Sequence, residues 1–103
     1  MSKSQSITED QLDLMHIIEC DSNASQRKIA KKTGLSIGKV NYCLKSLIDI
    51  GFIKVDNFNK SSQKLNYAYI LTSKGIQEKV AVTKQFIIIK KQEYDKLNSY
   101  IIK

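Results

Sequence analysis

Polar and basic side chains follow a glycine turn near the middle of the sequence, where residues 36–46 read SIGKVNYCLKS. An asparagine can bond adenine through two hydrogen bonds, and a lysine can reach O6 and N7 of guanine. Tyrosine and serine hydroxyls can bond phosphates or base edges, and a glycine leaves room for a backbone to approach a duplex. The candidate nucleic-acid-binding residues of this segment are Ser36, Gly38, Lys39, Asn41, Tyr42, Lys45 and Ser46.

Helical spacing separates most of these side chains from the apolar ones of the same segment. At 100° per residue, the apolar side chains fall within an arc of about 140°. They are Val40, Cys43, Leu44, Leu47 and Ile48. The pattern predicts a helix over residues 37–50 that Gly51 ends, with its apolar side buried and its polar side outward. An ordinary solvated surface is the alternative reading of that polar side.

A shorter helix precedes this one across a tight turn. Ser25 is a good N-cap for a helix over residues 26–33, and Gly34 can end that helix in the left-handed conformation. Two helices joined so closely cross steeply, as in a helix-turn-helix, whose second helix enters the DNA major groove. Arg27 and Lys28, at the start of the shorter helix, would meet phosphate through their charges and nearby free amides.

The pattern becomes alternating after Gly51, which indicates β-structure. Residues 52–58 and 66–72 are predicted as two strands joined by a polar hairpin loop. The loop residues that supply charge and hydrogen-bond donors are Lys60, Ser61, Ser62 and Lys64. Lysine binds phosphate as a point charge, so we expect this wing, residues 57–66, to lie on the DNA backbone or minor groove without reading much sequence.

Two further helices complete the expected chain. Thr8 and Gln11 form a capping box for a helix that reaches about Cys20, and Thr72 or Ser73 begins a long helix that reaches about residue 100. The expected fold class is mainly α with a small β-hairpin, a winged helix-turn-helix followed by a long C-terminal helix. We expect a DNA-binding domain over residues 7–72 and a dimerisation helix over residues 73–103.

The long helix carries apolar residues at alternating spacings of four and three, a heptad seam with one lysine. The seam consists of Ile76, Val80, Thr83, Ile87, Lys90, Tyr94, Leu97 and Ile101, and residues 86–89 are apolar around a whole turn. A two-fold homodimer would cover this surface. Its expected interface residues are Val80, Thr83, Phe86, Ile87, Tyr94, Leu97 and Ile101. The alternative is a helix folded back on its own domain.

Composition and charge narrow the function classes. The 103 residues suit one compact domain, and their net charge of +7 is unevenly distributed. Residues 1–24 hold one base and five acids, whereas residues 25–103 hold sixteen bases and five acids. The basic part would approach a polyanion first. No run of eighteen apolar residues and no signal peptide is present, so we expect a cytoplasmic protein without a membrane segment.

Enzyme chemistry has little support in the sequence. The single His16 lies among hydrophobic neighbours, and no Gly-rich phosphate loop or His/Cys metal spacing occurs. Cys20 and Cys43 are interpreted as small buried side chains. We therefore expect no catalytic residue, no metal ion and no cofactor.

The segments SQRKIAKKTGLSIGKVNYCLKSLIDIGFIKV and YILTSKGI, with the polar hairpin between them, resemble the winged-helix domain of MarR-type transcriptional regulators. Within these, they most resemble the short regulators associated with bacterial exopolysaccharide gene clusters. The resemblance covers about residues 7–95 and implies a bacterial, dimeric regulator of transcription that binds double-stranded DNA. The family's wing usually carries an Asp and Arg pair, but residues 56–66 contain no arginine.

Other functions stay open at this point. Full-length MarR proteins have an additional N-terminal dimerising helix and a crevice for phenolic ligands, whereas this sequence begins close to its first helix. We therefore expect the fold and DNA binding to transfer, and leave a small-molecule effector open. A winged helix that binds an acidic protein through the same basic surface is the main alternative. RNA is disfavoured, because the A-form major groove is too narrow for a helix.

Overall fold

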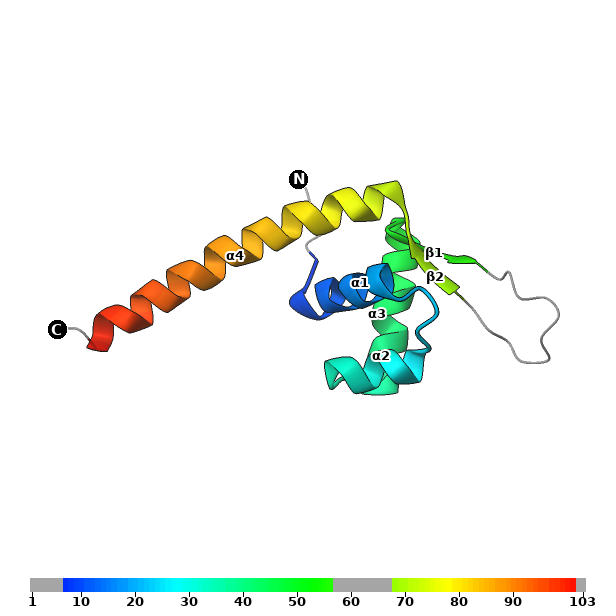
Figure 1. Ribbon diagram of the computed structural model, residues 1–103, viewed down its shortest axis with the longest axis horizontal. Coiled ribbons are helices and arrows are strands. Elements are labelled where there is room, and N and C mark those ends of the chain that lie inside the picture. Colours follow the sequence, from blue (N-terminus) through cyan, green and yellow to red (C-terminus); the bar gives the residue numbers. More distant parts are fainter. Residues whose placement is uncertain (1–6, 57–67, 102–103) are drawn as a thin grey trace.

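Four helices and a two-stranded antiparallel sheet make up the described part of the chain (Figure 1). The computed structural model describes residues 7–56 and 68–101. The elements are α1 (Glu9–Cys20), α2 (Gln26–Thr33), α3 (Ile37–Ile50), β1 (Ile53–Asp56), β2 (Ala68–Leu71) and α4 (Ser73–Ile101). The expected fold class is confirmed: a mainly helical chain with a helix-turn-helix, a two-stranded wing and a long C-terminal helix.

Local hydrogen bonds define the helix boundaries. Thr8 and Gln11 form the expected capping box, since the Thr8 hydroxyl accepts from the Gln11 amide at 3.1 Å and the Gln11 side chain accepts from the Thr8 amide at 2.9 Å. Gly34 and Gly51 end α2 and α3 with φ of 79° and 93°, values that favour glycine. At the start of α4, Thr72 is the capping residue, because its hydroxyl accepts from the Gly75 amide at 3.0 Å.

The core gathers one side of each of the first three helices against the sheet. α1 lies centrally and contacts α2, α3 and α4 (Figure 1). The largest fully buried side chains come from these helices and β1: Leu14, Met15, Ile18, Ile29, Val40, Leu44, Leu47 and Ile53. β2 is tied to the loop before α2 as well, because the Tyr69 amide donates to the Ser22 carbonyl at 3.1 Å. The core thus fixes the position and orientation of α3 in the domain.

One detail of burial differs from the sequence-based expectation. Cys43 is buried, but Cys20, the last residue of α1, is exposed. Burial raises the pKa of the Cys43 thiol, which keeps it protonated and unreactive. On β1, Ile53 is buried whereas Val55 is 42% exposed, so only the start of this strand reaches the core.

The first turn of α4 is locked against the end of α3. The Thr72 hydroxyl donates to the Gly51 carbonyl at 2.6 Å, and the Thr72 amide donates to the Phe52 carbonyl at 3.0 Å. A side chain at Gly75 would collide with the backbone carbonyl of Phe52. This close approach sets the direction in which α4 leaves the domain.

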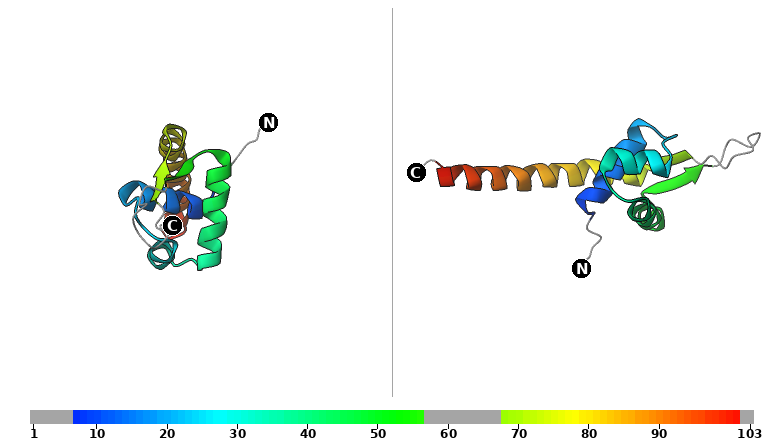
Figure 2. Two further views of the ribbon diagram at one scale, coloured as in Figure 1. Left: turned by 90° about the vertical axis from the view of Figure 1, so that its right-hand side faces the viewer. Right: turned by 90° about the horizontal axis from the view of Figure 1, so that it is seen from below.

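Two ion pairs then hold α4 antiparallel to α1. Lys79 pairs with Glu19 at 2.6 Å, and Lys90 pairs with Glu9 at 3.1 Å, at opposite ends of α1. The Glu9 carboxylate raises the pKa of Lys90. Beyond Lys90 the helix extends past the domain, with every side chain exposed as far as Ile101 (Figures 1 and 2). The chain is therefore elongated, with extents of 64 × 32 × 21 Å.

Replacing Gly75 by alanine should lower the free energy of unfolding by about 1–3 kcal/mol, because the methyl group would push α4 away from Phe52. Gly38→Ala is the matched control. A side chain at Gly38 on α3 would meet only Ser36 Oγ, at an ordinary contact distance of 4.0 Å, so alanine there should stabilise the protein by about 1 kcal/mol through helix propensity. Thermal and urea unfolding measure both. Equal stability of Gly75→Ala and the natural chain would contradict the locking of α4.

Candidate nucleic-acid interface

α3 has one buried and one open side. Its buried residues are Val40, Cys43, Leu44 and Leu47. On the other side Gly38, Lys39 and Lys45 are exposed, and Tyr42 is 69% exposed. Figure 2 shows α3 standing at the outer edge of the molecule. The predicted division of α3 into an apolar and a polar side is confirmed, and no element in the described ranges 7–56 and 68–101 covers Tyr42.

Asn41 is held at the border between the two sides. It is half-buried, and its Oδ1 accepts a hydrogen bond from Gln26 Nε2 at 3.4 Å. The same Gln26 nitrogen donates to the Tyr69 hydroxyl at 3.3 Å. Gln26 therefore links the first turn of α2, α3 and β2, and fixes the orientation of the Asn41 amide. Gln26 was not predicted as a site residue, because its only signal in the sequence is a position in the first turn of α2.

The two serines of α3 have different roles. Ser36 is exposed at the N-cap, where its Oγ accepts from the Lys39 amide at 3.0 Å and its hydroxyl hydrogen is left to donate. Ser46 needs a correction, because its side chain faces α1. Its Oγ accepts from Nε2 of the buried Gln11 at 2.9 Å. This bond satisfies a buried amide, so Ser46 connects α1 to α3 and does not lie with the outward residues.

Arg27 and Lys28 both lie exposed on α2, but only one of them is free of an acidic partner. Lys28 Nζ is 2.9 Å from the Asp21 carboxylate. This hydrogen bond, together with one from the Asn23 amide, holds the pKa of Asp21 below its usual 3.8, so the pair is charged at neutral pH. The Lys28 amide is also engaged, because it donates to Ser25 Oγ at 3.1 Å. Arg27 takes part in none of the ion pairs among the described residues.

The ion pairs concentrate positive charge on α2 and α3. Glu9 and Glu19 are neutralised by lysines of α4, on the opposite side of α1 from α2. None of the pairs formed within the described part of the chain involves Lys31, Lys39 or Lys45. The helix-turn-helix therefore presents uncompensated basic side chains, which attract a polyanion.

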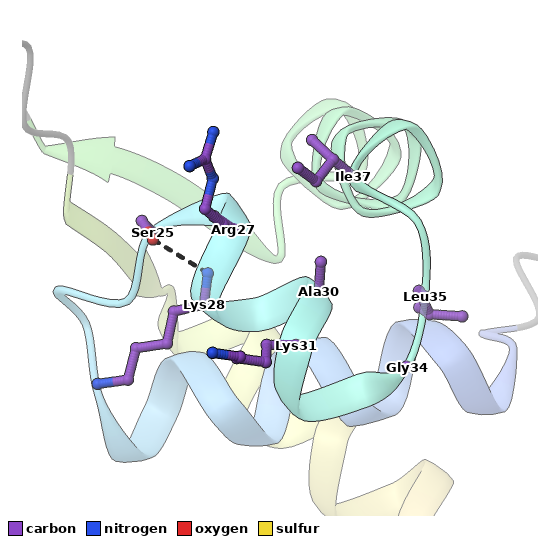
Figure 3. A pocket seen from close by; sticks show the side chains of 8 residues that line it. All are labelled: Ser25, Arg27, Lys28, Ala30, Lys31, Gly34, Leu35 and Ile37. Atoms are coloured by element: carbon purple, nitrogen blue, oxygen red, sulfur yellow. Dashed lines mark hydrogen bonds between the residues drawn. The ribbon is translucent and has the colours of Figure 1, made fainter.

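A hollow of about 640 Å³ lies beside the turn between α2 and α3 (Figure 3). Its lining residues are Ser25, Arg27, Lys28, Ala30, Lys31, Gly34, Leu35 and Ile37. Ile37 is 47% exposed although it is a large apolar residue. Ile37 was not predicted as a site residue, because it lies outside the apolar arc of α3 and carries no polar group.

The four predicted wing residues, Lys60, Ser61, Ser62 and Lys64, lie outside the described residues. The described strands that lead into the wing pair antiparallel from Ile53 with Leu71 to Asp56 with Ala68. The base of the wing is thus fixed beside the C-terminal end of α3 (Figure 1).

The predicted dimer residues on α4 are mostly open to solvent. Val80, Ile87, Tyr94, Leu97 and Ile101 are exposed, and Thr83 is half-buried. Phe86 needs a correction, because it is half-buried and packs against the core of its own domain. It lies on the same side of α4 as the buried Val82, four residues away, and so contributes to the attachment of α4.

The described residues were also searched for a metal site and for a membrane-spanning helix. Within residues 7–56 and 68–101, no group of three or more His, Cys, Asp or Glu side chains is placed to hold a metal ion. None of the helices in this part of the chain is long and apolar enough to cross a membrane.

Comparison with known proteins agrees with this geometry. Residues 11–54 match a family model described as winged helix-turn-helix DNA-binding. A search of curated protein sequences finds no match. These residues cover α2, α3 and most of α1, the part of the chain that presents the exposed basic side chains.

Several solved structures share the fold. A MarR/EmrR family transcriptional regulator from Acinetobacter sp. ADP1 has a TM-score of 0.61 and 24% identity, over 89% of this chain and 68% of that protein. MepR, a regulator of a Staphylococcus aureus multidrug efflux pump, has a TM-score of 0.67 and 18% identity, over 94% and 76%. Streptococcus pneumoniae FabT in complex with DNA has a TM-score of 0.66 and 17% identity, over 91% and 64%.

The FabT structure contains DNA, and the Acinetobacter protein and MepR are regulators of transcription. The similarity extends over α4 as well as over the helix-turn-helix, since it covers about nine-tenths of the chain. Residues 11–54 are thus similar to winged helix-turn-helix DNA-binding domains, and the chain has the fold of the MarR transcriptional regulators.

Proposed function

We propose that this protein is a sequence-specific transcriptional regulator that binds double-stranded DNA as a homodimer, with α3 in the major groove. The observation that carries the proposal is the outer side of α3. Lys39, Tyr42 and Lys45 are exposed there, without acidic partners among the described residues, on a helix-turn-helix whose inner side is sealed in the core. A helix of this shape fits the B-form major groove.

The side chains divide into base-reading and backbone-binding groups. Asn41, oriented by Gln26, is suited to adenine, because the bond from Gln26 leaves both of its amide hydrogens and an oxygen lone pair available. Lys39 is suited to guanine, and Tyr42 to a base edge or phosphate. Ser36, Lys45, Arg27 and Lys28 are suited to the phosphates that fix the helix in register, and Gly38 lets the backbone come close.

The proposal includes the wing, whose four polar residues are predicted from the sequence. Lys60, Ser61, Ser62 and Lys64 would contact the DNA backbone or minor groove beside the site of α3. Support comes from the strands that precede and follow them, which hold the base of the wing next to α3. Lysine rather than arginine in this loop favours contact with phosphate.

The homodimer rests on the exposed apolar side of α4. Val80 and Ile87 are exposed along the attached part of α4, and Tyr94, Leu97 and Ile101 continue the heptad seam beyond Lys90, where α4 extends past its domain. Only Gly75 and Val82 of this 29-residue helix are buried. A second copy of α4 would cover the seam and present two recognition helices to half-sites about one DNA turn apart.

Membership of the exopolysaccharide-associated group stays a prediction from the sequence. Binding of a small-molecule effector is not part of this proposal.

Selection of bound duplexes from a random pool tests the proposed function. We expect enrichment of an inverted repeat whose half-sites are centred about one DNA turn apart. A pool that stays random after repeated rounds would contradict sequence-specific binding and favour a protein partner.

Asn41→Ala should relax the base preference at one position of each half-site by about 1–3 kcal/mol, because it removes a bidentate contact. Arg27→Ala is the matched contrast. It should weaken all duplexes alike and reduce the salt slope by about one unit, because it removes a phosphate contact. Fluorescence anisotropy on the selected duplex and its single-base variants measures both. If the two variants act identically on selected and random duplexes, the assignment of base reading to Asn41 is wrong.

Asp21→Asn should tighten DNA binding and steepen the salt slope by about one unit, because it frees Lys28 from its ion pair. The Asn side chain can still accept the hydrogen bond from the Asn23 amide, so the loop should persist. Asp95→Asn adds the same charge on α4, away from α2 in the same chain, and should change binding little. Equal effects of the two variants would mean that overall charge, and not Lys28, is responsible.

Leu97→Glu should convert a dimer to a monomer, because it places two carboxylates in the apolar seam. Gln92→Glu lies on the other side of α4 and should leave the dimer intact. Sedimentation at micromolar concentration should give twice the chain mass of 11.8 kDa for the natural protein and for Gln92→Glu. A natural protein that sediments as a single chain would remove the dimer from the proposal.

A further inference from the structure

Ile37 is an apolar side chain in a basic surface. It is the first residue of α3 and is 47% exposed. Figure 3 shows it extending from α3 toward the space over α2 into which Ala30 and Arg27 also project. Ala30 is buried, so the hollow has an apolar floor and Ile37 forms one wall of it.

The fold does not require an isoleucine at this position. Residues at the first turn of a helix need only permit helical geometry, and a β-branched side chain is a weaker helix former than alanine. Ile37 is not among the residues that pack against the core cluster, whereas its neighbour Leu35 is. Its exposed apolar surface therefore costs solubility without a matching gain in the stability of a single chain.

The surroundings of Ile37 identify the kind of group that would cover it. Arg27, Lys28 and Lys31 line the same hollow, and Lys39 is exposed two positions along α3. The partner must therefore be an anionic molecule that also offers a small apolar group. In the major groove of a DNA duplex, the 5-methyl group of thymine is the apolar feature that proteins contact.

We propose that Ile37 contacts the 5-methyl group of a thymine and so determines specificity at one position of each half-site. This inference rests on the proposed function, since it needs α3 in the major groove. At the first position of α3, Ile37 lies at the end of the helix from which base edges are usually read. Arg27, across the hollow, is placed to hold the phosphate chain beside that thymine.

Deoxyuridine replaces thymine with the loss of the methyl group alone, so it isolates this contact. In the duplex selected from the random pool, each thymine in turn is replaced by deoxyuridine, and binding is measured by anisotropy. For the natural protein, one position per half-site should lose affinity roughly fourfold, the effect of one buried methyl group. Ile37→Val, which keeps a branched side chain, should show the same sensitive position.

Ile37→Ala should bind the thymine duplex about as weakly as the natural protein binds the deoxyuridine duplex, and should be indifferent to the replacement. Thermal unfolding checks that this exposed position tolerates alanine. An enriched duplex whose affinity is insensitive to every methyl group, or whose sensitive thymine stays sensitive in Ile37→Ala, would overturn this inference and leave the proposed function standing. A pool without any enriched duplex would overturn both.

Discussion

The burial of one side of α3 is the constraint on which the interface depends. Gly34 adopts a left-handed φ of 79°, which ends α2 and lets α3 begin at once behind the Ser36 cap. α3 can then pack Val40, Leu44 and Leu47 into the core, and the rest of its circumference is left to solvent. The outward polar groups are therefore a consequence of how the inner side is held. An amphipathic helix fixed in this way has a rigid outer face, and rigid placement is what base reading requires.

The packing of α4 against α1 also brings acidic and basic side chains together. Glu9 and Glu19 of α1 pair with Lys90 and Lys79 of α4, so these two acids do not neutralise bases of α2 or α3. The helix-turn-helix keeps its positive charge. Asp21 is the one acid that reaches an α2 base in the described structure, and it competes with any phosphate for Lys28. The basic side chains of α2 and α3 that are unpaired among the described residues thus favour the approach of DNA to that side of the molecule. α4 packs against α1 and, in our proposal, forms the homodimer.

Sequence patterns predicted the elements and their boundaries well, because caps, glycines and apolar periods act locally. They failed where a contact joins distant elements. Ser46 has the chemistry of a groove residue but accepts a hydrogen bond from Gln11 of α1, and Phe86 belongs to the apolar turn 86–89 but packs on its own core. Gln26 and Ile37 were overlooked for the converse reason, since their roles arise only from where α2 and α3 are brought together.

The most direct test of the account is a titration of the isotope-labelled protein with its selected duplex, followed by nuclear magnetic resonance of the backbone amides. Our account predicts that the largest shift changes at the DNA surface fall on the first turn of α2 and on α3 from Ser36 to Lys45, with little change along the outer side of α4. Shift changes confined to α1 or α4, with the amides of Asn41 and Tyr42 unaffected, would contradict it.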